Sequence, residues 1–129
     1  LAGFMRIFSP WFPVHWADRV INIHPSLLPS FKGLNVQRQA LDAGVRLSGC
    51  TVHFVIPDLD AGPIIAQAAV PVLAGDTDDT LSARILRQEH RLYPLVVRWF
   101  AEDRIATTGG RVTIRDIPPG ATLLFSPEP

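Results

Sequence analysis

Residues 19–33 read RVINIHPSLLPSFKG, and they join a strand to a loop. The β-branched run at residues 19–23 predicts a short buried strand. The two prolines and the glycine within residues 24–33 predict a loop, which carries unusually many apolar side chains. Asn22 and His24 lie two positions apart on the strand, so their side chains point to the same face. Such a polar pair is costly on an otherwise apolar strand unless it is partnered.

The segments on either side of this stretch alternate between helical and strand patterns. The remaining predicted elements are a strand end at residues 1–8, helices at residues 11–16, 34–43 and 78–102, strands at residues 48–56 and 64–73, and a hairpin at residues 104–117. This alternation predicts an α/β domain with a mostly parallel sheet flanked by helices. In such a sheet, ligands bind beyond the carboxyl ends of the strands. The loops at residues 24–33 and 57–63 are therefore expected to face one crevice.

The composition narrows the class of protein. The 129 residues fit one domain, and 47% hydrophobic with 19% charged residues suits a packed core. The 12 basic and 12 acidic residues cancel, so no nucleic-acid partner is expected. The single cysteine, Cys50, excludes an internal disulfide, and the 4 histidines lack metal-ligand spacing, so no metal site is expected. No run approaches the ~20 apolar residues of a membrane span. The single cysteine fits a reducing compartment, and a cytoplasmic protein is expected.

Asp60 is a second candidate for chemistry, in the loop that follows the strand at residues 48–56. If the two loops are neighbours, its carboxylate can approach His24 and favour the imidazolium form. A cation, an amide and a carboxylate in one cleft can stabilise an oxyanion and move protons. Each residue also has a plainer interpretation. Asn22 can tie down a loop, His24 can be a satisfied core histidine, and residues 58–62 can form an ordinary turn.

Three more residues leave two interpretations open. Glu89 interrupts the apolar stripe of the long helix, where it either reaches water at the edge or contacts a ligand. Arg6 lies in the apolar first segment and either faces an anionic group at the cleft rim or simply reaches water. His53 lies within a strand, where a structural role competes with support for the site. The sequence has no Gly-rich phosphate loop and no Ser or Cys nucleophile motif.

The segment at residues 22–29, NIHPSLLP, resembles the formyltransferases that use 10-formyltetrahydrofolate. The supporting segments, in the family's order, are LAGFMRI at residues 1–7, GCTVHFV at residues 49–55, LDAGP at residues 59–63 and QEH at residues 88–90. Within that family the sequence is most similar to the phosphoribosylglycinamide formyltransferases of de novo purine (IMP) biosynthesis, over about residues 1–105. The resemblance implies a Rossmann-like fold and transfer of a formyl group to the amine of 5'-phosphoribosylglycinamide.

The resemblance also implies a catalytic trio of Asn22, His24 and Asp60. Asn22 would donate a hydrogen bond to the formyl oxygen, and His24, as imidazolium, would stabilise the oxyanion of the tetrahedral intermediate. Asp60 would keep His24 charged and help to remove the proton from the attacking amine, through water. The substrate amine is then the nucleophile, which explains why the sequence needs no Ser or Cys nucleophile.

Two binding regions and their support follow from the same resemblance. The co-substrate 10-formyltetrahydrofolate would contact Met5, Arg6, Ile7, Phe8, Phe12, Ile56, Pro57, Asp58, Leu59 and Asp60. The substrate phosphoribosylglycinamide would contact Asn22, Pro25 and Glu89, while Thr51 and His53 would support the site from behind. The partners would be these small molecules, with no nucleic acid and no membrane, and a homodimer is compatible with the resemblance.

The resemblance also predicts the limits of the catalytic domain. Residues 1–107 would form the catalytic domain and residues 108–129 a C-terminal hairpin and tail. The family begins with a strand and a phosphate-binding loop that the sequence lacks, so the isolated chain is expected to have little activity.

Two related enzymes and one non-enzyme are the alternatives. A formyltetrahydrofolate hydrolase tends to carry His-Ser-Phe-Leu-Pro in the loop, and a methionyl-tRNA formyltransferase has an Ala before Ser-Leu-Leu-Pro, where Pro25 stands here. A folate-binding module without activity is the non-enzymatic alternative. Formate release without an amine acceptor would favour the hydrolase.

Overall fold

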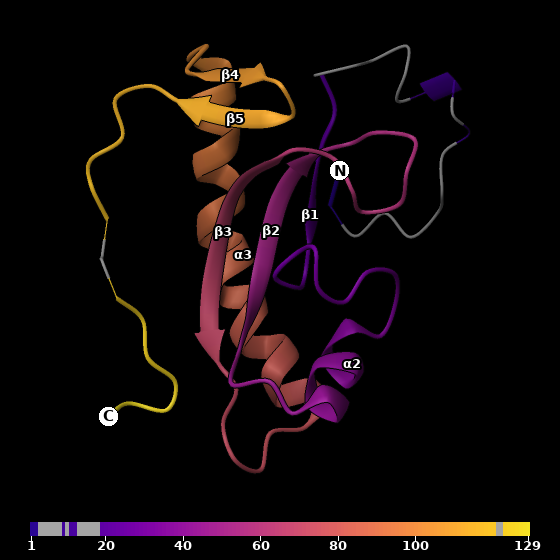
Figure 1. Ribbon diagram of the computed structural model, residues 1–129, viewed down its shortest axis with the longest axis vertical. Helices are drawn as coiled ribbons and strands as arrows, with labels where there is room; N and C mark the ends of the chain where they lie inside the picture. The colour runs from indigo at the N-terminus through magenta and orange to yellow at the C-terminus, as the bar shows by residue number, and fades with distance from the viewer. Residues whose placement is uncertain (3–8, 10, 13–18, 121–122) are drawn as a thin grey trace.

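The computed structural model describes residues 1–2, 9, 11–12, 19–120 and 123–129. Its elements, in chain order, are β1 (Ile21–His24), α2 (Val36–Ala43), β2 (Leu47–Phe54), β3 (Ile64–Pro71), α3 (Asp78–Ala101), β4 (Ile105–Thr108) and β5 (Arg111–Ile114) (Figure 1). Each coincides with a predicted helix, strand or hairpin arm, so the α/β class is confirmed. The strand predicted at residues 1–8 and the short helix predicted at residues 11–16 lie largely outside the described residues.

The strands β1, β2 and β3 form one sheet in that order, and both pairings are antiparallel. The prediction of a mostly parallel sheet is therefore wrong for the described strands. A parallel return needs a crossover of about a dozen residues or more, and residues 55–63 between β2 and β3 are too few. The longer connection from β1 to β2 contains α2, but α2 lies at the end of the sheet where β2 begins (Figure 1). The chain therefore re-enters the sheet near the end at which it left.

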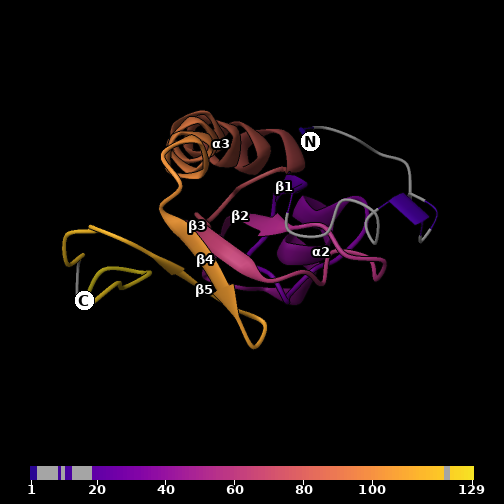
Figure 2. The ribbon, with the colours of Figure 1, turned by 90° about the horizontal axis from the view of Figure 1, so that it is seen from above.

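The core lies between the sheet and α3, which Figure 2 shows along one side of the strands. The fully buried helix residues Leu81, Ile85 and Val96 belong to one cluster with Cys50 and Val52 of β2. This cluster confirms the apolar stripe that the sequence predicts for the long helix. Because side chains alternate along a strand, the residues between those of the core point to the opposite face of the sheet. The sheet thus has one apolar face against α3 and a second face that can carry polar groups.

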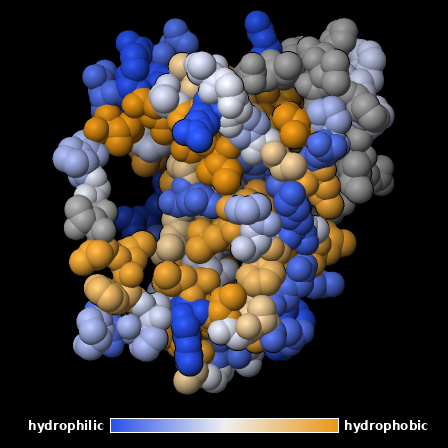
Figure 3. All heavy atoms as spheres, in the orientation of Figure 1, coloured by the Kyte–Doolittle hydropathy of each residue, from blue (hydrophilic) through white to orange (hydrophobic). Residues whose placement is uncertain are grey.

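The chain after α3 forms the predicted hairpin and then a separate C-terminal segment. β4 and β5 pair antiparallel across Gly109 and Gly110, and both glycines have the positive φ that a tight hairpin turn requires. The exposed large apolar residues of the C-terminal segment include Leu123, Leu124 and Phe125. Hydrophobic side chains accordingly gather along this segment at the left of Figure 3. These three side chains remain outside the core that the sheet and α3 form.

A buried ion pair between Asp76 and Arg84 holds the start of α3 against the end of β3. Asp76 accepts hydrogen bonds from Arg84 Nη1 at 2.8 Å, Arg84 Nη2 at 2.9 Å, the Leu73 N–H at 2.7 Å and Thr80 Oγ1 at 2.9 Å. The Asp76 side chain is only 4% exposed. Arg84 Nη1 also donates to the Pro71 carbonyl at the end of β3, at 2.9 Å. The Arg84 guanidinium therefore holds the pKa of the Asp76 carboxyl well below its usual value of 3.8.

Replacing Asp76 by asparagine is expected to lower the free energy of unfolding by about 2 kcal/mol, because Arg84 loses its charged partner. The stabilisation from ionised Asp76 is present above pH 3.8, the usual pKa of the group, and is lost as the pH falls below that value. Urea unfolding at pH 7 and at pH 3 measures both effects. The exposed Asp79 in the first turn of α3 supplies the control Asp79→Asn, with an expected loss of at most ~1 kcal/mol. Equal losses for the two variants at pH 7 would contradict this account of Asp76.

Candidate active site

Polar side chains of β1 and β2 share the sheet face that lies away from α3. In the register of the two strands, Asn22 stands opposite His53, and His24 stands opposite Thr51. These residues alternate with members of the core cluster such as Ile23, which places them on the other face. His24, Thr51 and His53 are all buried, with exposed fractions of 6%, 0% and 3%. The structure therefore brings two expected catalytic residues together with the two expected to support the site.

His24 and Asp60 lie side by side and form a histidine–carboxylate pair. His24 Nδ1 lies 3.6 Å from Asp60 Oδ1, and the two side chains are 7% and 10% exposed. His24 Nε2 donates to the Phe31 carbonyl oxygen at 2.9 Å. Both ring nitrogens thus face oxygen acceptors, which a doubly protonated ring can serve with one N–H each. The geometry suits an imidazolium beside a carboxylate, with both groups largely shielded from water.

Two loops meet to form this pair, as the sequence predicts. They leave opposite ends of the sheet, because β1 and β2 are antiparallel. Asp60 adopts the left-handed conformation with φ 48°, and its Oδ2 accepts the Gly33 N–H at 2.9 Å. Gly62 allows a close approach to β2, because a Cβ there would lie 1.6 Å from the Phe54 carbonyl oxygen. The loop at residues 24–33 therefore folds back on itself, and its last residue holds the carboxylate.

The same loop is anchored on β2 and β3. Thr51 donates its hydroxyl to the Ser26 carbonyl at 2.7 Å and accepts the Leu28 N–H at 3.1 Å. Gln67 of β3 stands opposite Thr51 and donates Nε2 to Thr51 Oγ1 and to the Leu28 carbonyl, both at 3.0 Å. Thr51 thus holds the loop that follows His24 against β2. Sequence reasoning misses Gln67, and the signal that could have found it is a single glutamine on an otherwise apolar strand.

Asn22 and His53 contribute two buried acceptor atoms at opposite positions of β1 and β2. His53 Nδ1 donates to the Phe54 carbonyl at 2.9 Å, and burial lowers the pKa of this histidine. The neutral ring then carries its proton on Nδ1 and leaves Nε2 as an acceptor. Among the described residues, neither His53 Nε2 nor Asn22 Oδ1 has a hydrogen-bond partner. Each of these two atoms can therefore accept a hydrogen bond.

Glu89 lies on α3, the helix that packs against the apolar face of the sheet. Its side chain is half-buried, and burial raises the pKa of its carboxyl, while the charges of His90 and His24 act in the opposite direction. Pro25 directly follows His24 and is also half-buried. Both residues expected to contact the ribonucleotide, besides Asn22, therefore lie in the neighbourhood of His24.

The residues expected to bind folate are only partly placed by the structure. Ile56 is half-buried, and Pro57, Asp58 and Leu59 are exposed in the loop that leads to Asp60. Phe12 is helical, and its N–H donates to the Ser9 carbonyl at 3.1 Å. The expected folate residues outside the described part of the chain are Met5, Arg6, Ile7 and Phe8.

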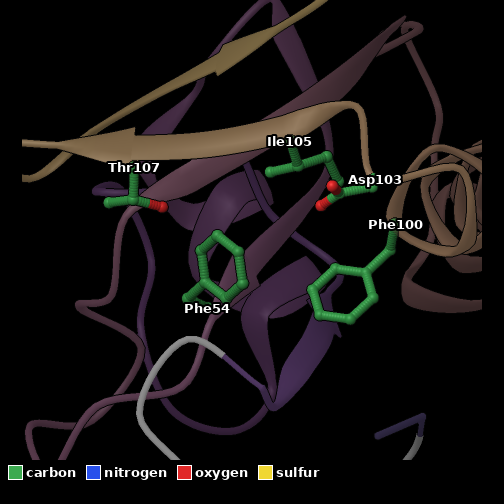
Figure 4. A pocket seen from close by; sticks show the side chains of 5 residues that line it. All are labelled: Phe54, Phe100, Asp103, Ile105 and Thr107. Carbon is green, nitrogen blue, oxygen red and sulfur yellow. The ribbon is translucent and has the colours of Figure 1, made fainter.

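A separate cavity of about 200 Å³ lies beyond the apolar face of β2 (Figure 4). Its described lining residues are Phe54, Phe100, Asp103, Ile105 and Thr107. The rings of Phe54 and Phe100 are tilted at 56° with centroids 6.2 Å apart. This cavity therefore does not open on the His24 side chain. Within the described residues, no helix is long and apolar enough to cross a membrane, and no group of three or more His, Cys, Asp or Glu could hold a metal ion.

A buried histidine paired with a carboxylate, on the polar face of an α/β sheet, is the kind of site with which enzymes move protons and stabilise oxyanions. Comparison with known proteins assigns the family. Residues 1–97 match the family described as formyl transferase, and the chain belongs to that family.

Two named relatives show how far the likeness extends. Over 105 residues the chain is 57% identical to the phosphoribosylglycinamide formyltransferase of Escherichia coli (strain K12). The aligned segment covers 81% of this chain and 50% of that protein. Over 105 residues it is 54% identical to the trifunctional purine biosynthetic protein adenosine-3 of Homo sapiens, covering 81% of this chain and 10% of that protein. The chain thus spans about half the length of the bacterial relative.

Solved structures agree with the described fold. The phosphoribosylglycinamide formyltransferase of Anaplasma phagocytophilum is similar with a TM-score of 0.89 and 53% identity, over 92% of this chain and 59% of that one. A formyltetrahydrofolate deformylase from Pseudomonas syringae pv. tomato is similar with a TM-score of 0.83 and 36% identity, over 88% of this chain and 38% of that one. Transfer and hydrolysis enzymes therefore both share the fold seen here.

Proposed function

We propose that this chain is part of a phosphoribosylglycinamide formyltransferase, which moves a formyl group from 10-formyltetrahydrofolate to the amine of 5'-phosphoribosylglycinamide in purine biosynthesis. The observation that carries the proposal is the buried His24–Asp60 pair, with 3.6 Å between Nδ1 and Oδ1, beside Asn22 of the same strand as His24. Identities of 57% and 53% to two proteins of that name support the choice of substrates.

The proposed mechanism uses the three residues in distinct roles. The substrate amine attacks the formyl carbon, a carbon–nitrogen bond forms, and the carbonyl oxygen becomes an oxyanion. The His24 imidazolium stabilises this oxyanion, and the Asn22 amide donates a further hydrogen bond to it. Asp60 keeps the ring charged and, through water, accepts the proton that the amine loses. The bond from the formyl carbon to the folate nitrogen then breaks, and a proton passes to that nitrogen.

The proposal includes the two binding regions. Folate would lie against the loop of Ile56 to Asp60, whose exposed side chains are free to meet a ligand, and against the first segment of the chain. The residues of that segment assigned to folate are Met5, Arg6, Ile7, Phe8 and Phe12. Glu89 and Pro25 would contact the ribonucleotide, since both are half-buried near His24. Much of the rate enhancement would then come from holding amine and formyl group in contact.

Hydrolysis of formyltetrahydrofolate is the second candidate function. The similarity to the Pseudomonas deformylase, at a TM-score of 0.83, favours it, because the same His24–Asp60 pair could activate water in place of an amine. The two functions differ only in the nucleophile, so they are separated by supplying or withholding the amine.

The test assays the full-length gene product with 10-formyltetrahydrofolate, with and without phosphoribosylglycinamide. Spectroscopic appearance of tetrahydrofolate reports loss of the formyl group by either reaction, and an enzymatic formate assay reports hydrolysis alone. We expect tetrahydrofolate only when the amine is present and little formate in either case. Formate release without the amine would replace the proposal by the hydrolase, and folate binding without any turnover would replace it by a binding module.

A further inference from the structure

Two glutamines hold the loop that supplies partners to His24 and Asp60. From β3, Gln67 Nε2 donates to the Leu28 carbonyl and to Thr51 Oγ1, both at 3.0 Å. From α2, Gln39 Nε2 donates to the Lys32 carbonyl at 3.0 Å and to the Leu34 carbonyl at 2.8 Å. The loop is therefore fixed at its middle, at Leu28, by one side-chain amide and near its end by another.

Between these two anchors, the loop backbone holds both members of the His24–Asp60 pair. The Phe31 carbonyl accepts from His24 Nε2 at 2.9 Å and from Ser26 Oγ at 3.0 Å. The Gly33 N–H donates to Asp60 Oδ2 at 2.9 Å. A shift of the loop would therefore move the hydrogen-bond partner of the imidazole and that of the carboxylate together.

Thr51 connects the first anchor to this backbone. Its hydroxyl donates to the Ser26 carbonyl and accepts from the Leu28 N–H and from Gln67 Nε2. One donated and two accepted hydrogen bonds fill the capacity of a hydroxyl group. Thr51 also stands opposite His24 in the strand register. The Gln67 amide therefore donates a hydrogen bond to the cross-strand neighbour of His24.

We propose that Gln67 is a positioning residue, which sets the placement of His24 and Asp60 by fixing the loop at residues 25–33 through Leu28 and Thr51. The inference rests on the proposed function, in which this pair carries the chemistry. Gln67 itself is exposed overall, so its replacement leaves the core intact while it removes two donors. Since the side chain does not contact the ring, its effect on the reaction is transmitted by the loop backbone.

Three variants of the full-length gene product, labelled with 15N histidine, test the proposal. Gln67→Glu keeps the shape of the side chain and loses both N–H donors, and Gln67→Met loses them without adding charge. Gln37→Glu on α2 makes the same chemical change away from Leu28 and Thr51 and is the matched control. The readouts are the imidazole 15N resonances of His24, the steady-state constants for formyl transfer, and the thermal midpoint.

We expect both Gln67 variants to shift the ring resonances of His24 and to leave those of the exposed His90 in place. We expect kcat to fall on the order of tenfold with KM nearly unchanged, because small misplacements of catalytic groups are costly. Stability alone does not account for displaced His24 resonances at a temperature where the variant is fully folded. The control should match the wild type in every readout.

Other results would overturn the proposal. The proposal fails if the Gln67 variants match the control, or if kcat falls without a shift of the His24 resonances. It also fails if only Gln67→Glu loses activity, because the effect is then due to the added charge. If the wild type does not transfer formyl groups, the proposed function fails. The His24 resonances then still decide whether Gln67 positions the ring.

Discussion

Replacing His24 by glutamine should reduce kcat for formyl transfer by about 1000-fold in the full-length gene product, because the oxyanion loses its cationic partner. Glutamine keeps most of the side-chain volume and an N–H that can still reach the Phe31 carbonyl, which now accepts from His24 Nε2 at 2.9 Å. The loss should therefore reflect charge rather than unfolding. Steady-state kinetics with both substrates, together with a thermal melt, measures the effect.

The control for this change is His90→Gln. His90 follows Glu89 on α3 and is exposed, so the same substitution there should leave kcat within about twofold of the wild type. KM for the folate should change little in either variant, because the His24 ring is assigned to the transition state and not to ground-state binding. A His24→Gln enzyme that keeps a tenth of the wild-type kcat would remove His24 from the mechanism.

The local elements of this fold could be predicted because each has a signal within its own segment. The apolar spacing of Leu81, Ile85 and Val96 predicts the buried face of α3, and Gly44 ends α2 in the left-handed conformation expected of a C-cap. The direction of β3 relative to β2 could have been predicted, because residues 55–63 are too few for a parallel return. The direction of β1 relative to β2 could not be predicted from a local signal. It depends on where α2 lies relative to the sheet, and nothing in the helix sequence specifies that position.

In the candidate site, too, the sequence pattern predicts which face a side chain points to, but not the path of the backbone. The spacing of Asn22 and His24 predicts their shared face, and the pairing of His24 with Asp60 was expected from two loops facing one crevice. The loops do meet, but through the fold of the loop backbone and not through parallel strand ends. A single glutamine on an otherwise apolar strand could have drawn attention to Gln67. Its partners could not have been named, because they include the Leu28 carbonyl, and main-chain acceptors leave no mark on the residue type.

Replacing Asp60 by asparagine should reduce kcat by about 100-fold while folate binding persists, because the change removes a charge and a proton acceptor but little else. Asparagine tolerates the left-handed conformation at φ 48°, and its side-chain oxygen can still accept the Gly33 N–H that lies 2.9 Å away. The contact between the two loops should therefore survive. The exposed Asp79 in the first turn of α3 supplies the control Asp79→Asn, for which we expect no loss of kcat.

Asp60→Ala separates the structural role of this carboxylate from its chemical role. Alanine offers no acceptor to Gly33 and is strained at a positive φ, so this variant should weaken folate binding as well as catalysis. Equilibrium titration with a stable folate analogue and steady-state kinetics on all three variants distinguish the roles. If Asp60→Asn loses folate binding in step with kcat, the carboxylate acts by holding the loop, and the proton transfer must be assigned to another group. If it loses only kcat, the charge beside His24 is what the reaction requires.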